Sequence, residues 1–369
     1  MTQVLAFGTY NSRKHPRVGI LIDGLRDNGC IVTEINHPLL LSTAGRVEIL
    51  KKPWKLFGFA WTVLTLWRQL ATDAKQWMSV NGRPDAVLVG YMGHFDVLLA
   101  HHLFHGIPIV LDHLIFAGDT AKDRGATGIK VKLLNKLDRM AINAATLILV
   151  DTQEHQEMLR ENDRSMVVPV GAPEEWFHIQ HLESAKKDLV FYGLFTPLQG
   201  TLVIADALIL LAKEGIRPQT TLIGKGQDYP EVRAKLDAFE HVNFVEWIEP
   251  EALPGTVASH AIALGIFSTT PKGLRVVPNK VYQSMAAGCA VITSDTPPQR
   301  RMLGSGLTLT TPGDPIALAN AIKHLLTDES ALLEASHKAT EAASKFTPSS
   351  VSKPLSEWVK RDVNHHTGE

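Results

Sequence analysis

Short apolar segments rich in β-branched residues alternate with longer segments of helical periodicity along the whole chain. This alternation is typical of parallel sheets, because each parallel strand is reached through a right-handed helical crossover. In the first half it predicts strands at 4–8, 31–36, 86–91, 109–112, 147–151 and 167–170. In the second half it predicts strands at 189–192, 220–223, 243–246, 262–267 and 290–293, and helices near 201–214, 230–240, 280–287 and 315–326. The pattern indicates an α/β fold with two parallel sheets.

The length of 369 residues is more than one hydrophobic core usually holds. A polar segment at 171–188, with Gly and Pro and no sustained periodicity, separates the two runs of strands and is interpreted as a linker. We therefore expect an N-terminal domain at 1–175 and a C-terminal domain at 187–345. The tail at 346–369 has helical spacing of apolar residues, and we expect it to pack back across the cleft between the domains.

Composition and charge limit the possible partners and location. The formal net charge is −1, so no global basic field attracts nucleic acid, which we do not expect as a partner. The two cysteines, Cys30 and Cys289, lack the spacing of a disulfide framework or zinc site. The N-terminus runs straight into an apolar strand without the features of a secretion signal. These observations favour a cytoplasmic protein.

The segment Gly273 to Asp295 carries the strongest sign of a ligand site. Pro278 disfavours helix before it and Asn279 is a good N-cap residue, so we expect a helix from Lys280 that stops at Gly288. Free amides at a helix start, together with Arg275 and Lys280, would suit a diphosphate. The alternative is an ordinary capped helix in which Lys280 is merely solvated.

Two further segments place glycines directly after apolar strands. Gly193 ends the strand at 189–192, and Gly224 and Gly226 follow the strand at 220–223. Glycine lets the backbone approach a phosphate closely, but it also permits an ordinary tight turn. A third glycine at the spacing of a dinucleotide motif is missing, so either interpretation is open.

Taken in this order, the three segments resemble the donor domain of family-four retaining glycosyltransferases over nearly all of 189–327. The sequence PNKVYQ at 278–283 is similar to the donor-site helix of a bacterial subgroup. The resemblance implies the GT-B fold, in which two Rossmann-like parallel-sheet domains face each other across a cleft. It also implies a nucleoside diphosphate sugar held by the C-terminal domain. The residues expected at this donor are Gly193, Gly224, Gly226, Arg275, Asn279, Lys280, Val281 and Gln283.

The chain departs from the family pattern at several charged positions. Two acidic residues of the family correspond here to Arg275 and Gln283, and its Arg and Lys after the first donor-domain strand fall on Leu194 and Gln199. The resemblance suggests that Arg275 and Lys280 take over the diphosphate contacts. Gln283 would then hydrogen-bond a ribose hydroxyl.

The N-terminal half resembles the same subgroup more loosely, through segments at 90–96, 109–124 and 149–155. Here we expect the acceptor, beside polar or small residues at strand ends. Asp112 and His113 are the preferred catalytic pair, because they stand at the end of a predicted strand. The alternative is a solvated loop with local Asp caps. The other residues expected on the acceptor side are Gly8, Asp119, Asp123 and Arg124.

Metal and cofactor sites are not expected. His101, His102 and His105 have helical spacing, but no acidic or Cys ligand accompanies them at a motif spacing. No Asp-x-Asp motif occurs in the chain. We therefore expect a metal-independent reaction, in which backbone amides and cations neutralise the leaving diphosphate.

The segment at 51–70 combines three Trp, two Phe and four basic residues. Such a helix could lie on an anionic membrane surface as a peripheral contact. Alternatively it is a long helix buried against the first sheet, because its apolar residues run nearly all round it. Its apolar run is too short to span a bilayer.

The expected activity is transfer of a sugar from a nucleoside diphosphate sugar to an acceptor hydroxyl of a glycan or lipid-linked acceptor. The resemblance implies retention of configuration and a role in bacterial surface glycan synthesis. A nucleotide-sugar epimerase and a non-catalytic glycosyltransferase-like binding subunit are the alternatives.

Overall fold

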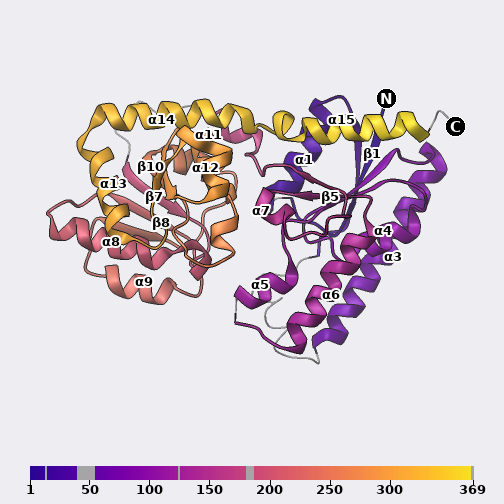
Figure 1. Ribbon diagram of the computed structural model, residues 1–369, viewed down its shortest axis with the longest axis horizontal. Coiled ribbons are helices and arrows are strands. Elements are labelled where there is room, and N and C mark those ends of the chain that lie inside the picture. The colour runs from indigo at the N-terminus through magenta and orange to yellow at the C-terminus, as the bar shows by residue number, and fades with distance from the viewer. Residues whose placement is uncertain (13–14, 40–54, 124, 180–186, 367–369) are drawn as a thin grey trace. The chain divides into compact units, whose positions relative to one another are not determined.

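The computed structural model describes residues 1–12, 15–39, 55–123, 125–179 and 187–366. The chain forms two compact units (Figure 1). The first contains Met1–Val150, His155–Val168 and the residues from Ser352 onward, and the second contains Asp151–Glu154 and Pro169–Val351.

The first unit is built on a six-stranded sheet in the order β2-β1-β3-β4-β5-β6, with every neighbouring pair parallel. The strands are β1 (Gln3–Gly8), β2 (Ile31–Asn36), β3 (Ala86–Val89), β4 (Ile109–Asp112), β5 (Leu147–Val150) and β6 (Ser165–Val167). Four of them are buried at nearly every position, as expected of strands covered by helices on both faces. Five of the six predicted strands are present close to their expected bounds, whereas the one predicted at 167–170 was misplaced, since β6 ends at Val167.

Helices connect these strands. They are α1 (Pro16–Asp27), α3 (Lys55–Asn81), α4 (Asp96–Leu103), α5 (Ala117–Asp123), α6 (Ile129–Ala144) and α7 (Gln153–Gln156). One apolar core contains side chains of α3, α4 and α6 together with those of β1, β3 and β4. Within the described residues, no helix has the length and apolarity that a membrane span requires.

The second unit repeats this architecture with the strand order β12-β11-β10-β7-β8-β9. Its strands are β7 (Lys187–Tyr192), β8 (Thr220–Ile223), β9 (Val242–Val245), β10 (His260–Leu264), β11 (Ala290–Ser294) and β12 (Thr308–Thr310). The five predicted strands are present. The prediction missed β12, which is too short for its alternation to stand out.

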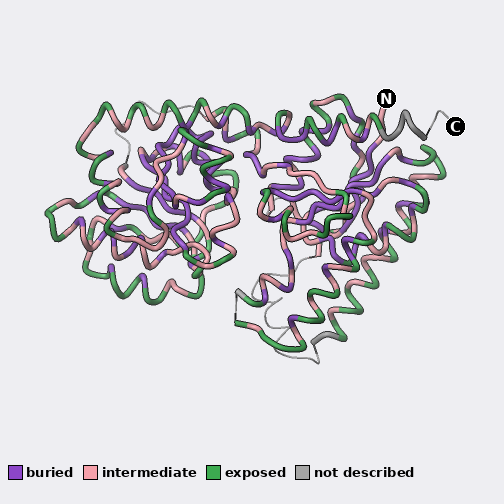
Figure 2. Tube along the Cα trace, in the orientation of Figure 1, coloured by how far each residue is buried: buried purple, intermediate pink, exposed green. Residues whose placement is uncertain are grey.

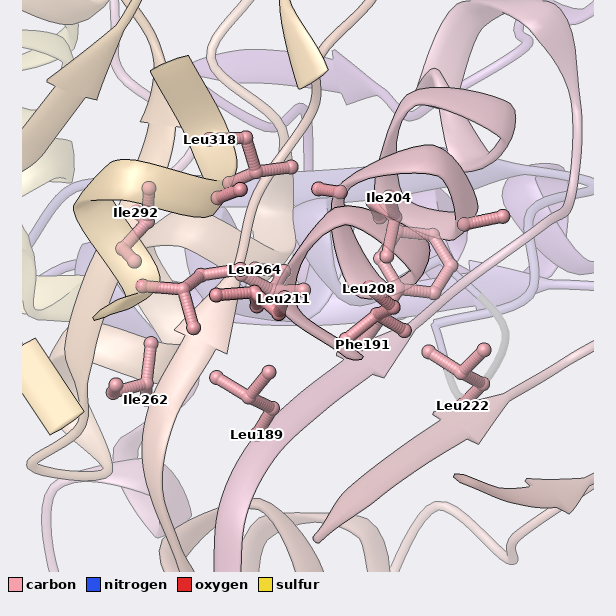
Figure 3. Close-up of a cluster of buried hydrophobic side chains, with 14 of the residues drawn as sticks. Leu189, Phe191, Ile204, Leu208, Leu211, Leu222, Ile262, Leu264, Ile292 and Leu318 are labelled. Atoms are coloured by element: carbon pink, nitrogen blue, oxygen red, sulfur yellow. The ribbon is translucent and has the colours of Figure 1, made fainter. Parts of the chain in front are cut away.

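The helices of the second unit are α8 (Thr201–Lys213), α9 (Tyr229–Leu236), α10 (Leu253–Ala258), α11 (Asn279–Ala286), α12 (Pro297–Leu303), α13 (Pro315–Thr327) and α14 (Glu329–Ala343). They include the four that were predicted, as α8, α9, α11 and α13, and three that were not, α10, α12 and α14. Figure 3 shows how Ile204, Leu208 and Leu211 of α8 pack on Leu189, Phe191 and Leu264 of the sheet, in one continuous core. This core fixes the loops that leave the strand ends.

The segment at 171–188, predicted as a linker, is partly integrated into the second unit. A 3-10 helix at Glu174–Trp176 buries Trp176, whose ring stacks on Tyr192 at a centroid distance of 5.9 Å. Residues 180–186 lie outside the described part of the chain.

The last helix, α15 (Pro348–His366), supplies residues to the first unit from Ser352 onward. The Ser352 hydroxyl donates to the Ile20 carbonyl oxygen at 3.4 Å, and Lys360 Nζ donates to the Asn28 carbonyl oxygen. Leu355 and Val359 are buried. The first unit is therefore completed by residues from the opposite end of the sequence.

Strand order indicates where each sheet can bind a ligand. In an open parallel sheet, ligands bind beyond the carboxyl ends of the two strands where the winding direction reverses. In the second sheet these strands are β7 and β10, and in the first they are β1 and β3. A ligand site is therefore expected at the loops that follow these strands.

Candidate functional site

In the second unit, the loops after β7 and β10 are joined by hydrogen bonds. The chain leaves β7 at Gly193, passes through a 3-10 turn at Pro197–Gln199 and enters α8 after Gly200. The amide of Phe267, just beyond β10, donates to the Gln199 carbonyl oxygen at 3.1 Å. The loop after β7 is thus held against the backbone that follows β10.

Glycines make this close packing possible. A Cβ at Gly224 would lie 2.0 Å from the Gly193 carbonyl oxygen, and a Cβ at Gly226 would lie 2.2 Å from that of Phe195. A Cβ at Gly200 would lie 2.6 Å from the Phe267 carbonyl carbon. Separations this short are not tolerated, so each position needs glycine to let neighbouring loops meet. The packing explains Gly224 and Gly226 without a ligand.

Helix α11 begins one residue earlier than predicted. Asn279 is its first residue and Pro278 stands at the N-cap, with no side-chain cap hydrogen bond. The prediction that Asn279 caps the helix was wrong, because the extended conformation that a cap requires is already taken by Pro278, whose φ is −73° and ψ 152°. Residues 280–286 are all buried, including Val281.

Lys280 is buried, contrary to the interpretation of a solvated side chain. It is 6% exposed, and its Nζ lies 3.7 Å from the centroid of the Phe191 ring. Within the described residues, this Nζ has no hydrogen-bond partner. Burial lowers the pKa of the amine well below its usual value. A buried amine without an acceptor is costly, which makes Lys280 a candidate for binding an anionic or polar ligand.

A second unsatisfied polar atom lies beside the same loop. Gln199 Oε1 is buried and has no hydrogen-bond donor among the described residues. A Cβ placed on Gly193 would lie 3.1 Å from Lys280 Nζ and 4.0 Å from Gln199 Oε1. Gly193, whose φ is +139°, has no side chain, so Lys280 Nζ and Gln199 Oε1 both lie close to the space beside its Cα. A donor and an acceptor in this position can bind a polar ligand.

Tyr192, at the end of β7, fixes the first turn of α11. Its hydroxyl donates to the Lys280 carbonyl oxygen at 3.0 Å and lies 3.1 Å from the Ser284 hydroxyl. Gln283 Oε1 lies 3.5 Å from the same hydroxyl, and Gln283 itself is buried. Burial raises the pKa of Tyr192, so the hydroxyl stays protonated. These contacts anchor the backbone around Lys280.

Arg275 lies in a 3-10 turn at Gly273–Arg275, between β10 and α11. The hydroxyl of Thr152 donates to the Arg275 carbonyl oxygen at 2.9 Å. The turn is therefore tied to the short segment Asp151–Glu154 of the same unit.

In the first unit, Asp112 is part of a buried ion pair. Arg17 Nε lies 3.2 Å from Asp112 Oδ1, and the two side chains are 2% and 0% exposed. The alternative of a solvated loop is therefore wrong for Asp112. The carboxylate holds α1 against the end of β4.

His113 is also buried, and its ring packs edge-on against those of His94 and Phe116. Burial, and secondly the neighbouring His94, lower the pKa of His113 to about 3. The imidazole is therefore neutral at physiological pH. Its Nε2 has no hydrogen-bond partner in the described part of the structure.

One group of side chains among the described residues could hold a metal ion. It consists of His94, His113 and Asp138, which each offer one ligand atom within 4.8 Å of the other two. Asp138 is already engaged, since Oδ1 accepts from Ala117 N at 2.8 Å and lies 3.0 Å from His94 Nε2. Asp138 Oδ2 accepts from Gly118 N at 3.0 Å. Asp138 thus caps the start of α5 and orients His94, which accounts for the cluster structurally.

Sequence reasoning missed Asp96, which organises the end of β1. Its Oδ2 accepts from the amide of Thr9 at 2.7 Å and from the Thr9 hydroxyl at 2.8 Å, and Trp67 Nε1 donates to Oδ1 at 3.2 Å. A Cβ at Gly8 would lie 2.9 Å from Asp96 Oδ2. Gly8 is thus needed for this contact.

The remaining acceptor-side candidates are only partly described. Asp119 lies in the first turn of α5 and is partly exposed. Asp123 ends that helix, but its side chain lies outside the described residues, as does Arg124.

Comparison with known proteins gives a family match for part of the chain. Residues 186–328, which contain β7 to β12 and the Lys280 site, match the family model of glycosyl transferases group 1. A comparison with curated protein sequences finds no match.

Solved structures resemble the chain over almost its whole length. Sucrose-phosphate synthase from Thermosynechococcus elongatus has a TM-score of 0.70 at 14% identity, covering 98% of this chain and 99% of that one. HepE from Anabaena in complex with UDP and glucose has a TM-score of 0.68 at 15% identity, covering 98% and 100%. A glycosyltransferase involved in avilamycin A biosynthesis has a TM-score of 0.61 at 13% identity, covering 99% and 98%. The chain has the two Rossmann-like domains of the GT-B fold, as the sequence predicted.

Proposed function

We propose that this protein is a glycosyltransferase that takes a sugar from a nucleoside diphosphate sugar bound by the second unit. The observation that carries the proposal is Lys280, a buried amine without a partner beside the strand end where a parallel sheet binds ligands. Support comes from the match of 186–328 to glycosyl transferases group 1. The similar fold of HepE, whose complex contains UDP and glucose, favours a uridine nucleotide.

In this proposal Lys280 and Arg275 neutralise the diphosphate. A phosphate beside Lys280 Nζ would raise the pKa of the amine again, because an opposite charge favours the ammonium form. The ammonium then stabilises the negative charge that develops on the leaving diphosphate. Gln199 Oε1 would accept from a hydroxyl of the donor, and Gln283 from the ribose. The cations of the protein would thus carry the role that a metal ion has in other transferases.

We further propose that the acceptor is a glycan or lipid-linked hydroxyl at the first unit, near the ends of β1 and β4. The sugar would be transferred with retention, and the departing phosphate oxygen would assist deprotonation of the acceptor. Asp112 and His113 would have a structural role there, because Asp112 is ion-paired with Arg17 and His113 is neutral and buried. Asp119, which is partly exposed, is better placed to meet an acceptor.

The experiment is to incubate the full chain with UDP-, GDP- and ADP-sugars, with and without a set of alkyl glycosides, and to analyse products by mass spectrometry and NMR. We expect release of one nucleoside diphosphate that depends on the alkyl glycoside, together with a new glycosidic product. Conversion of a donor to its epimer without acceptor would identify an epimerase instead. Binding of a nucleotide with neither reaction would identify a non-catalytic subunit.

A further inference from the structure

Helix α3 of the first unit has a long N-terminal part, 57–66, in which no side chain is buried, before Trp67 packs, partly buried, against the core. Between Phe57 and Gln69 no residue is buried, and the first buried side chain is Leu70. Phe57, Trp61 and Leu64 are 83%, 69% and 50% exposed. The alternative of a helix buried throughout is therefore wrong for this part. A soluble helix rarely exposes such large apolar side chains without a partner.

Helix α6 presents the same composition. Ile129 and Leu133 are 77% and 62% exposed, and the exposed Lys132 and Lys136 stand between and beside them. No Asp or Glu occurs in the sequence at 55–72 or at 125–137. The two helix segments therefore combine exposed apolar side chains with positive charge alone.

The topology brings these segments to one edge of the sheet. Each helix leads into a parallel strand, α3 into β3 and α6 into β5, so each runs antiparallel to the strands and begins at their carboxyl edge. Both helices also contact α4. With 27 residues, α3 is about 40 Å long. Figures 1 and 2 show that it extends well beyond the ends of the strands.

Phe95 connects this surface to the ends of the strands. Its ring packs edge-on against Phe59 of α3 at a centroid distance of 6.1 Å, and Phe95 is itself 38% exposed. It precedes α4 directly, in the loop after β3. The exposed apolar side chains thus extend from α3 to the loop at the carboxyl edge.

We propose that α3 and α6 form a docking surface for an anionic lipid bilayer. Trp and Phe insert at the boundary between head groups and acyl chains, and lysines attract anionic head groups. A second copy of the chain fits less well, because a two-fold interface would set these lysines against a like-charged surface. The inference goes beyond the proposed transfer reaction and holds whichever sugar or acceptor is used.

The test is co-sedimentation of the full chain with vesicles of phosphatidylcholine alone or mixed with phosphatidylglycerol. We expect binding to the anionic vesicles that weakens with salt. The double variants Phe57→Ser/Trp61→Ser and Lys132→Glu/Lys136→Glu should each reduce the partition coefficient roughly tenfold or more, since about 1 kcal/mol per basic residue corresponds to several-fold each. Because all four substituted positions are exposed, neither variant should disturb the core.

The matched control is Trp247→Ser in the second unit, because Trp247 is 66% exposed and Trp61 69%. This control should bind anionic vesicles as the unaltered chain does. Equal binding to both kinds of vesicle, or unchanged binding of the Phe57→Ser/Trp61→Ser variant, would overturn the proposal. The proposal would also be overturned if the chain bound no vesicles but formed a dimer in analytical ultracentrifugation, and if Phe57→Ser/Trp61→Ser abolished that dimer.

Discussion

Replacing Lys280 with Met should make the protein more stable without nucleotide and weaken its binding of the donor nucleotide by roughly ten- to a hundredfold. The gain arises because Met fills the space over Phe191 without a buried, unsatisfied amine, which costs about 1 to 3 kcal/mol. The loss arises because a charge-assisted hydrogen bond to phosphate contributes about 1.5 to 3 kcal/mol, and each 1.4 kcal/mol is tenfold. A purely structural lysine would give the gain without the loss.

The gain should also depend on pH. The pKa of Lys280 is lowered in the folded protein, so below about 10.5 the unfolded chain binds the additional proton and the lysine costs stability. This protonation cost disappears as the pH rises to that value, so the advantage of Met should shrink there to the part that comes from the unsatisfied neutral amine. Thermal unfolding with and without UDP measures both effects, with the exposed Lys213→Met of the same unit as control. Unchanged nucleotide binding in Lys280→Met would contradict the proposed site.

Replacing Asp112 with Ala should lower the free energy of unfolding by about 3 to 5 kcal/mol, because the substitution removes one partner of a buried ion pair with Arg17. The control is Glu214→Ala, which breaks the exposed pair between Lys323 and Glu214 and should cost no more than about 1 kcal/mol. Denaturant unfolding of both variants gives the comparison.

The variant Asp112→Asn decides between a structural and a catalytic Asp112. Asparagine keeps an oxygen that can accept from Arg17 but carries no charge, so a structural Asp112 predicts a less stable variant that still transfers sugar while folded. A catalytic base would be lost in Asp112→Ala and in Asp112→Asn alike. Full stability combined with loss of transfer would show that the carboxylate acts in the reaction and would contradict the structural interpretation.

The fold could be predicted because the signals that define it are local. The segments 189–192 and 220–223 are buried strands, and their short runs of apolar or β-branched residues mark them in the sequence itself. Strand ends were less certain, since the buried side chains of Ile266 and Phe267 continue the apolar run beyond the end of β10 at Leu264. Burial extends past the end of the strand there, and an apolar pattern cannot distinguish a buried strand residue from a buried loop residue.

The site could be predicted only in part, because its contacts join distant positions. Lys280 was placed at a helix start, but its burial depends on Phe191 and Gly193, which lie on another strand and loop. The pairing of Asp112 with Arg17 spans 95 positions, and no spacing in the sequence indicates it. Asp96 and Asp138 were likewise missed, since each is recognised by backbone amides of a different segment.

Hydrogen exchange of the full chain with and without UDP tests the central claim, that a donor nucleotide binds at the Lys280 site. The proposal predicts that UDP slows amide exchange in the loop 193–200 and in the first turn of α11 at 279–283, and that at the same UDP concentration Lys280→Met strongly reduces this protection. Protection confined to the first unit, or identical protection in the variant, would contradict it.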